Sequence, residues 1–302
     1  MSGSLPILSD LPSGYFVDES PGGILALHVD HARGVHAAGY GPAQDGSLTR
    51  SELSGRRPLY ELQSDGERLV VRRFSHGGLM RWVTGERYLD PERPFRELVL
   101  SDSLRRAGID TPQVVAARAR PAFVGGWYLD LVTRRIEGTT DLGFVMARAR
   151  AGELDVASKR TLLRATGALV RKLHRHGCLH SDLTPTNLLV ETNSLEAGEP
   201  RLWVIDLDGS IVRAKPTEGE LLKNLRRLYR YVWRREARLG RGLTRTDYLR
   251  FLAAYEPDRE ARRRVARGVL AGHRRSSVLH GLGWFFEALF GRRVDPRESP
   301  AG

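Results

Sequence analysis

Two kinds of hydrophobic spacing divide the chain, first alternation and then helical periodicity. From Leu59 onward, apolar and polar residues alternate, and the turn Ser64-Asp65-Gly66 separates two such runs, which predicts a β-hairpin. The strands expected after Leu59 are Tyr60–Gln63, Leu69–Phe74, Val114–Ala119 and Trp127–Thr133, and the apolar stretch Ile24–Val29 is a candidate for an earlier strand. Between them, apolar residues three or four positions apart predict a single helix, Pro94–Ala107, which is followed by Gly108.

Helical spacing dominates the chain after Gly138. The helices expected there are Asp141–Ala151, Lys159–His176, Glu218–Leu239, Thr246–Tyr255, Asp258–Ala271 and Ser277–Phe290. A β-rich part followed by a helical part predicts an α+β fold with two lobes. We expect an N-terminal extension and β-rich N-lobe over residues 1–137 and a helical C-lobe over residues 138–302, with the boundary near Ile136 to Thr139.

Composition sets outer bounds without deciding the function. The 302 residues, 41% hydrophobic and 28% charged, are typical of a soluble globular protein. The single cysteine, Cys178, excludes an intramolecular disulfide and fits a reducing compartment. The N-terminus has no signal-peptide pattern, and no run of about eighteen apolar residues predicts a membrane span. The formal charge of +12 suits nucleic acid, an anionic membrane or a phosphorylated substrate, but a general preference for Arg explains it as well.

A loop with the pattern H-x-D-x-x-x-x-N gives the strongest chemical indication. His180, Asp182 and Asn187 fill its fixed positions, between a predicted helix and the apolar run Leu188–Val190. A second apolar run ends at Asp206, nineteen residues after Asn187. In phosphoryl transfer such an Asp accepts the proton of an attacking hydroxyl, while the Asn and the later Asp hold Mg²⁺ under the ATP phosphates. An isolated H-x-D often only caps a turn, but this order of motifs and strands favours a kinase site.

The residues that grip the phosphates are expected on the β-rich lobe. Strand side chains alternate, so Val70 and Arg72 share a face, where Val70 would cover the adenine and Arg72 would reach the phosphates. Arg replaces the usual Lys, although a guanidinium binds phosphate well. If the register slips by one residue, Arg73 takes the place of Arg72. The alternative to a phosphate contact is that this arginine is only a solvated residue of an edge strand. Glu97, early on the predicted helix, is the expected carboxylate partner, unless it only favours the helix dipole.

Further candidates are marked less clearly. A glycine-rich phosphate loop is expected around Gly55, although no G-x-G-x-x-G pattern is present there. His180 is expected to hydrogen-bond locally and support the loop backbone. Asp208 binds a second metal or a substrate hydroxyl, or it caps the following turn, and we favour the cap. Asn224, on a predicted helix, is a candidate substrate contact.

Several stretches together resemble the lipopolysaccharide core kinases, most of all the 3-deoxy-D-manno-octulosonic acid (Kdo) kinase type. They are His180–Leu189, Val204–Asp208, Leu69–Leu79, Ala107–Pro112 and Asn224–Leu228, within about residues 55–235. Leu207 and Asp208 stand where protein kinases have Phe and Gly, no A-P-E segment follows, and the gap before the next predicted helix is short. These departures argue against a regulated protein kinase.

The resemblance implies a two-lobed, protein-kinase-like fold and ATP-dependent phosphorylation of a sugar hydroxyl of the lipopolysaccharide inner core, with Kdo on lipid A as the first choice. It implies that Asp182 is the general base and that Asn187 and Asp206 bind Mg²⁺. Arg72 and Glu97 would position the phosphates. The partners would be ATP and the lipid A–Kdo acceptor, not nucleic acid. A cytoplasmic enzyme at the inner membrane would bring its basic C-lobe to an anionic leaflet.

Some alternatives stay open at this point. The apolar segment Val278–Phe290 is either an interfacial helix or a helix docked on the C-lobe. A rival function is an atypical protein kinase or ATPase of the RIO or Bud32 type, whose basic surface would serve RNA or ribosome binding. A third is a pseudokinase, against which the complete set of Asp182, Asn187 and Asp206 counts.

Overall fold

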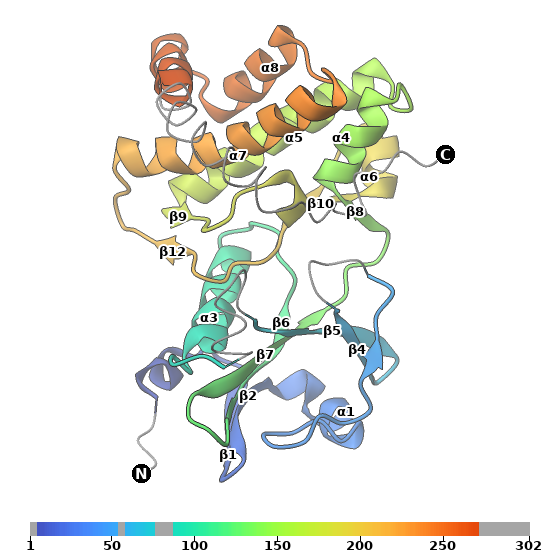
Figure 1. Cartoon of the computed structure of the whole chain (residues 1–302), viewed down its shortest axis with the longest axis vertical. Helices are drawn as coiled ribbons and strands as arrows, with labels where there is room; N and C mark the ends of the chain where they lie inside the picture. Colours follow the sequence, from blue (N-terminus) through green and yellow to red (C-terminus); the bar gives the residue numbers. More distant parts are fainter. Residues whose placement is uncertain (1–4, 54–57, 76–86, 272–302) are drawn as a thin grey trace, which may run out of the picture.

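A computed structural model describes residues 5–53, 58–75 and 87–271 of the chain. The N-terminal part is built on one antiparallel sheet of seven strands in the order β1-β2-β6-β7-β5-β4-β3 (Figure 1). The strands are β1 (Tyr15–Ser20), β2 (Gly23–His28), β3 (Thr49–Arg50), β4 (Tyr60–Ser64), β5 (Glu67–Arg73), β6 (Val114–Pro121) and β7 (Trp127–Arg134). The predicted hairpin is confirmed as β4 and β5.

Helix α3 (Arg93–Arg106) packs on the sheet and brings polar side chains to the junction with the helical part. Pro94 lies in its first turn, where the missing N–H leaves no hydrogen bond unmade, and Gly108 follows the helix with φ at +69°. Phe95 and Leu98 are fully buried in a core that they share with Leu129 of β7. Shorter helices lie nearer the N-terminus: η1 (Pro6–Asp10), η2 (Val29–His31) and α1 (Ala32–Ala37).

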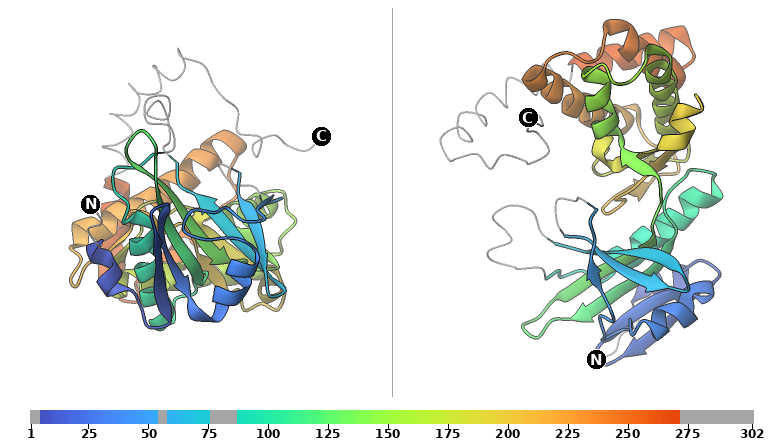
Figure 2. Two further views of the ribbon diagram at one scale, coloured as in Figure 1. Left: turned by 90° about the horizontal axis from the view of Figure 1, so that it is seen from below. Right: turned by 90° about the vertical axis from the view of Figure 1, so that its right-hand side faces the viewer.

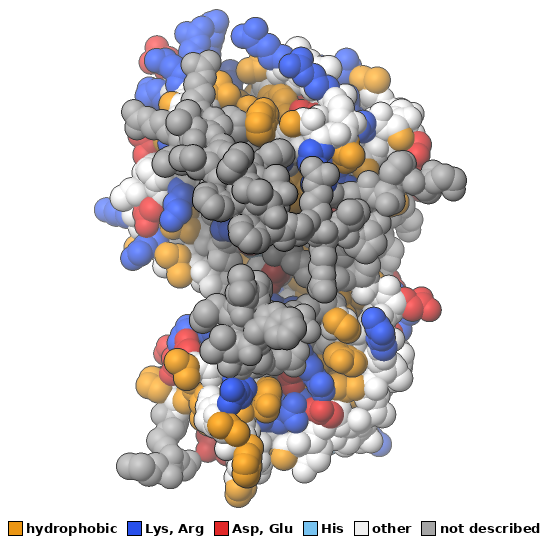
Figure 3. All heavy atoms as spheres, viewed as in Figure 1, with side chains coloured by type: hydrophobic (Ala, Val, Ile, Leu, Met, Phe, Trp, Pro, Cys, Tyr) orange, Lys and Arg blue, Asp and Glu red, His pale blue; other side chains and the backbone are white. Residues whose placement is uncertain are grey.

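The C-terminal part is mainly helical (Figures 1 and 2). Its helices are α4 (Leu142–Arg150), α5 (Val156–Arg175), η3 (Pro185–Asn187), α6 (Thr192–Glu196), α7 (Glu218–Leu239) and α8 (Arg245–Tyr255), and residues 259–271 are also helical. Asp155, Thr217 and Thr244 start α5, α7 and α8 by accepting backbone N–H groups. In Figure 3, Lys and Arg side chains gather along the upper and left margins of this part.

Short strands lie between the large sheet and the helices. β10 (Leu188–Glu191) pairs with β8 (Thr139–Asp141) and β11 (Leu202–Val204), and β9 (Cys178–Leu179) pairs with β12 (Ile211–Val212). The chain passes from the sheet to this region between β7 and β8, and Figure 2 shows the two parts stacked on either side of that passage. The exact division into residues 1–137 and 138–302 stays a prediction.

The sequence missed several short elements, among them β3, β9 and β12. β1, β8 and α6 were not expected either, since each is short or lies in a segment without clear periodicity. Two expected features, the Gly55 loop and the helix Ser277–Phe290, lie outside the described residues. Across the described ranges, no helix combines the length and the apolar composition needed to cross a membrane.

A buried charged cluster fastens the N-terminal segment to the sheet. Arg118 of β6 is fully buried and pairs with Asp130 of β7, which is itself buried. The same guanidinium donates to the carbonyl oxygens of Gly41 and Gln44 at 2.9 and 2.6 Å, and to Asp45 at 2.6 Å. A charge buried this deeply is tolerated only with its hydrogen bonds satisfied. Residues 41–45 therefore belong to the folded lobe and are not a loose extension.

His174 holds three helices of the C-terminal part together. Its Nδ1 lies 2.8 Å from the Tyr255 hydroxyl of α8, and its Nε2 lies 3.1 Å from Oδ1 of Asn224 on α7. Asn224 in turn donates from Nδ2 to the carbonyl oxygen of His180 at 2.6 Å. Burial lowers the pKa of His174, although the hydrogen bond to Asn224 opposes the shift. The neutral imidazole is thus part of the fold beneath the His180 loop.

We predict that His174 makes the fold sensitive to mild acid. Because its native pKa lies below the value of 6.5 in an unfolded chain, its contribution is complete above that pH and is lost as the pH falls. Chemical denaturation at several pH values would test this. The stability difference between wild type and His174→Gln should shrink from about pH 7 to about pH 5, by at most about 2 kcal/mol. A difference that stays constant would contradict the prediction.

Candidate active site

Strand β5 directs two of the predicted residues toward one cleft. Val70 and Arg72 alternate in phase on β5, and both line a cavity of about 470 Å³ that also has residues of β7 and β10 in its walls. Arg72 bridges two carboxylates: its Nη2 contacts Glu97 of α3, and its Nη1 lies 2.9 Å from Oδ1 of Asp206. Arg73 points elsewhere, with Nη2 at 2.6 Å from Asp45. The register predicted from the sequence is therefore the observed one, and Arg73 is not the residue in the cleft.

Glu97 is buried at the junction, with only 5% of its surface exposed. One oxygen meets Arg72, and the other accepts the backbone N–H of Leu207 at 3.1 Å. Burial raises the pKa of Glu97 to about 7, against the opposing charge of Arg72. A carboxylate with so little water depends on its cation to stay ionised. Glu97 is thus an ion-pair partner that joins α3 to the segment after Asp206, and it does more than favour a helix dipole.

The β10–β11 hairpin sets Asn187 and Asp206 side by side. Leu188 pairs with Val204, and just outside this pair the N–H of Ile205 donates to the carbonyl oxygen of Asn187 at 3.0 Å. Asp206 follows with φ at +60°, a backbone conformation that few non-glycine residues adopt. Proteins retain such a strained backbone conformation mainly where a side chain must point in a particular direction. Here the turn carries the carboxylate to Arg72.

Asp182 is held from two sides on the preceding loop. Nε of Arg227 on α7 lies 2.9 Å from its Oδ1, and Nδ2 of Asn187 donates to its carbonyl oxygen at 2.8 Å. Asn187 thereby uses its amide N–H group within the loop, which leaves its Oδ1 as the atom available to a cation. Arg227 also contacts the carbonyl oxygen of Ser181. The loop geometry therefore depends on a side chain from a distant helix.

His180 supports this loop, as expected. Its Nδ1 accepts the N–H of Asp182 at 3.0 Å, and its Nε2 lies 3.1 Å from the carbonyl oxygen of Ile205. The second contact requires the tautomer with hydrogen on Nε2. Burial lowers the pKa of His180, so the ring stays neutral. Asn224, expected to contact substrate, is instead buried between His174 and the His180 carbonyl group, and that prediction is wrong.

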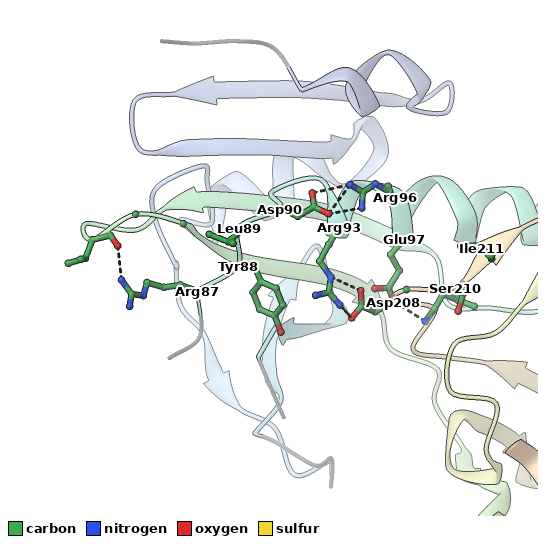
Figure 4. Close-up of a pocket in the computed structure, with 15 residues that line it drawn as sticks. Arg87, Tyr88, Leu89, Asp90, Arg93, Arg96, Glu97, Asp208, Ser210 and Ile211 are labelled. Atoms are coloured by element: carbon green, nitrogen blue, oxygen red, sulfur yellow. Dashed lines mark hydrogen bonds and ion pairs between the residues drawn. The ribbon is translucent and has the colours of Figure 1, made fainter. Parts of the chain in front are cut away.

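Asp208 does not cap the following turn. Its carboxylate forms a two-pronged ion pair with Arg93 in the first turn of α3, at 3.1 Å from Nε and 2.6 Å from Nη2 (Figure 4). The Arg93 guanidinium also lies over the Tyr88 ring, 4.7 Å from its centroid. These residues line a second cavity of about 750 Å³. Arg93 therefore gives α3 a second tie to the segment that contains Asp206.

The predicted residues reach the cleft to different extents. Four of them line the cavity of about 470 Å³: Val70, Arg72, Glu97 and Asp206. Its other walls include Leu131 of β7, Leu189 of β10 and residues 134–139 between the two parts of the molecule. Asp182 and Asn187 are joined to this group through the β10–β11 hairpin and are not among the lining residues. Gly55 lies outside the described residues.

The donor atoms suit a magnesium ion that arrives with a nucleotide. Among the described residues, no three His, Cys, Asp or Glu side chains gather closely enough to hold a metal by themselves. Mg²⁺ seldom needs such a cage, because it binds through one or two carboxylate or amide oxygens and completes its shell with phosphate oxygens and water. The Asp206 carboxylate and the Oδ1 of Asn187 are the oxygen donors that would contribute to such a partial site.

The fold defines the class of protein. A β-rich lobe with one prominent helix and a helical lobe meet at a polar cleft, which is the architecture of protein-kinase-like phosphotransferases. A similar solved structure, "WaaP in complex with acyl carrier protein", is 26% identical, covers 80% of this chain and 94% of that chain, and has a TM-score of 0.56. The predicted α+β, two-lobed fold is confirmed.

Sequence comparison gives the family. A family model described as "Lipopolysaccharide kinase (Kdo/WaaP) family" matches residues 44–255. The 3-deoxy-D-manno-octulosonic acid kinase of Haemophilus influenzae (strain PittEE) is 30% identical over 67% of this chain and 82% of its own length. The kinase of the same name from Xanthomonas euvesicatoria pv. vesicatoria (strain 85-10) is 26% identical over 78% and 90%. The chain belongs to the lipopolysaccharide kinase (Kdo/WaaP) family and is a phosphotransferase.

Adjacent arginines of β5 provide a test of the phosphate grip. Arg72→Ala would leave Glu97 buried without its cation, which should lower the free energy of unfolding by about 3–5 kcal/mol. We therefore expect kcat/KM for ATP to fall by roughly a hundred-fold or more. Arg73→Ala is the matched control, because that side chain pairs with Asp45 away from the cleft. Steady-state kinetics with thermal unfolding of both variants would decide, and equal losses in the two would contradict the assignment.

Proposed function

We propose that this protein transfers the γ-phosphate of ATP to a hydroxyl of Kdo on lipid A. The observation that carries the proposal is the convergence of Arg72, Glu97 and Asp206 in one cleft beside the Asp182 loop. The named activity of the curated relatives supports the choice of acceptor. The alternative of a RIO or Bud32 type of enzyme is not favoured by these relatives.

In this proposal the nucleotide lies between the sheet and β10. Val70 on the side of the sheet and Leu189 on the side of β10 would enclose the adenine, since both line the cleft. Asp206 and Asn187 would hold Mg²⁺, which neutralises charge on the transferring phosphates. Arg72 would keep its contact with Glu97 and turn its other nitrogen from Asp206 to a phosphate oxygen. Glu97 thus orients Arg72 and does not itself touch the nucleotide.

Asp182 would act on the acceptor. As the sugar oxygen forms its bond to the γ-phosphorus, the bond from that phosphorus to the β-phosphate oxygen breaks and ADP leaves. The hydroxyl proton passes to the Asp182 carboxylate. The ion pair with Arg227 holds the Asp182 carboxylate in a fixed place on the loop, where the acceptor hydroxyl would meet it. A cytoplasmic position at the inner-membrane surface is part of the proposal, because the acceptor is a lipid.

The roles of Asp182 and Asp206 predict two different kinetic defects. Asp182→Ala should reduce transfer to Kdo-lipid A by roughly a thousand-fold while ATP binding stays near normal, because the base acts on the acceptor. Asp206→Asn should weaken Mg²⁺-dependent ATP binding and turnover together. Mass spectrometry of the phosphorylated product and nucleotide-binding titrations would measure both. Wild-type turnover of Asp182→Ala would refute the base assignment.

A cavity in the helical part supports a second partner. It measures about 370 Å³ and lies among α4, α5, α7, α8 and residues 259–271, with an almost entirely apolar lining that includes Leu162, Leu225 and Leu228. The similar WaaP structure is a complex with acyl carrier protein. We infer that this chain binds an acylated acyl carrier protein and that the acyl chain enters this cavity, where burial of its methylene groups provides the affinity.

Cavity filling would test this partner. Acylated carrier protein should raise the melting temperature of wild type more than the unacylated form does, because a ligand that binds only the folded state stabilises it. Ala149→Trp, on the cavity wall, should remove that difference. Ala168→Trp, at an exposed position of α5, is the control. Equal stabilisation by the two forms of the carrier protein would exclude a role for the acyl chain.

A further inference from the structure

Helix α7 presents a row of arginines that starts at the proposed general base. At about 100° per residue, Arg227, Arg230 and Arg234 lie within about 60° of one another around the helix axis, and they extend about 10 Å along it. Arg227 contacts Asp182. Arg234 is exposed and Arg230 is half-buried. The row therefore leads from the catalytic loop along α7, the helix labelled in Figure 1.

Two carboxylates of α7, Glu220 and Glu236, are engaged away from this row. Glu220 closes the capping box with Thr217 at the start of the helix. Glu236 accepts the Tyr248 hydroxyl at 2.7 Å and two backbone N–H groups of the next loop. Within the described ranges, no carboxylate lies within ion-pair distance of Arg230 or Arg234. Their positive charge is therefore not neutralised by this part of the protein.

The arrangement weakens the helix that carries it. Arg230 and Arg234 are four positions apart, a spacing at which like charges destabilise a helix. Partial burial and then the charges of Arg234, Arg227 and Arg226 lower the pKa of Arg230. Arg226 and Arg235 differ, since they donate to the Gly268 carbonyl oxygen and the Tyr231 hydroxyl. Arg230 and Arg234, unlike Arg227, thus have no ion-pair partner inside the described part of the protein and suit an external anion.

We propose that Arg230 and Arg234 form a phosphate-binding subsite for the acceptor. The inference rests on the proposed function, because it needs an acceptor whose reacting hydroxyl lies at Asp182 and whose lipid portion carries phosphate. Guanidinium groups bind phosphate oxygens in pairs, with charge-assisted hydrogen bonds. Arg227 places this subsite next to the base, so binding of the phosphate orients the sugar. The phosphates of surrounding anionic lipids are the other source of the same chemistry.

Kinetics of Arg230→Ala/Arg234→Ala test the proposal. In neutral detergent micelles, we expect the KM for Kdo-lipid A to rise roughly ten-fold or more and the KM for ATP to stay unchanged. With dephosphorylated Kdo-lipid A the variant should match wild type, and higher salt should affect wild type more. Arg230→Lys/Arg234→Lys should recover part of the loss, which excludes simple misfolding. Arg160→Ala/Arg164→Ala on α5, exposed and equally spaced, is the matched control.

Each other outcome overturns the inference. An unchanged KM in micelles excludes the subsite, and a defect seen only on vesicles containing phosphatidylglycerol assigns the arginines to the membrane surface. An equal defect with both acceptors, or in the α5 control, shows that phosphate recognition is not involved. If wild type transfers phosphate to neither Kdo acceptor, the proposed function fails and the subsite fails with it. Transfer by wild type together with a normal variant rejects the subsite alone.

Discussion

The contact of Arg72 with two carboxylates connects the parts of this protein on which its chemistry depends. The guanidinium stands on the sheet, Glu97 on α3, and Asp206 on the turn after β11. Because Glu97 is buried enough to have a pKa of about 7, the position of α3 and the charge of Arg72 depend on each other. A guanidinium serves here better than an ammonium, since its planar fork reaches both carboxylates at once.

Local patterns predicted the elements and the residues whose roles are set within a few positions. The alternation of β5 placed Val70 and Arg72 on one face, and Glu97 was chosen because it is an acidic residue early on the single helix predicted in the β-rich part. The H-x-D-x-x-x-x-N loop and the later Asp206 followed from their order along the chain. Each of these inferences used periodicity or a motif, and the structure brings Arg72, Glu97 and Asp206 together in the cleft.

Contacts between distant segments could not be read from local patterns. Arg118 lies within a predicted strand, and no local pattern indicates that its partners come from residues 41–45. No local pattern indicates that Arg93 and Arg227 pair with Asp208 and Asp182. Asn224 was expected to contact substrate because of its place on a predicted helix, but it is buried. Whether a polar helix residue faces solvent or a loop is decided by tertiary packing, which a single sequence leaves undetermined.

The double attachment of α3 bears on how such an enzyme could be inhibited. Glu97 and Arg93 each connect α3 to the segment around Asp206. That segment is short, because α7 begins at Glu218, ten residues after Asp208. Compounds that select an outward-swung helix would have to break both ties. Molecules that compete for the nucleotide cleft, or that imitate the anionic acceptor, start without that penalty.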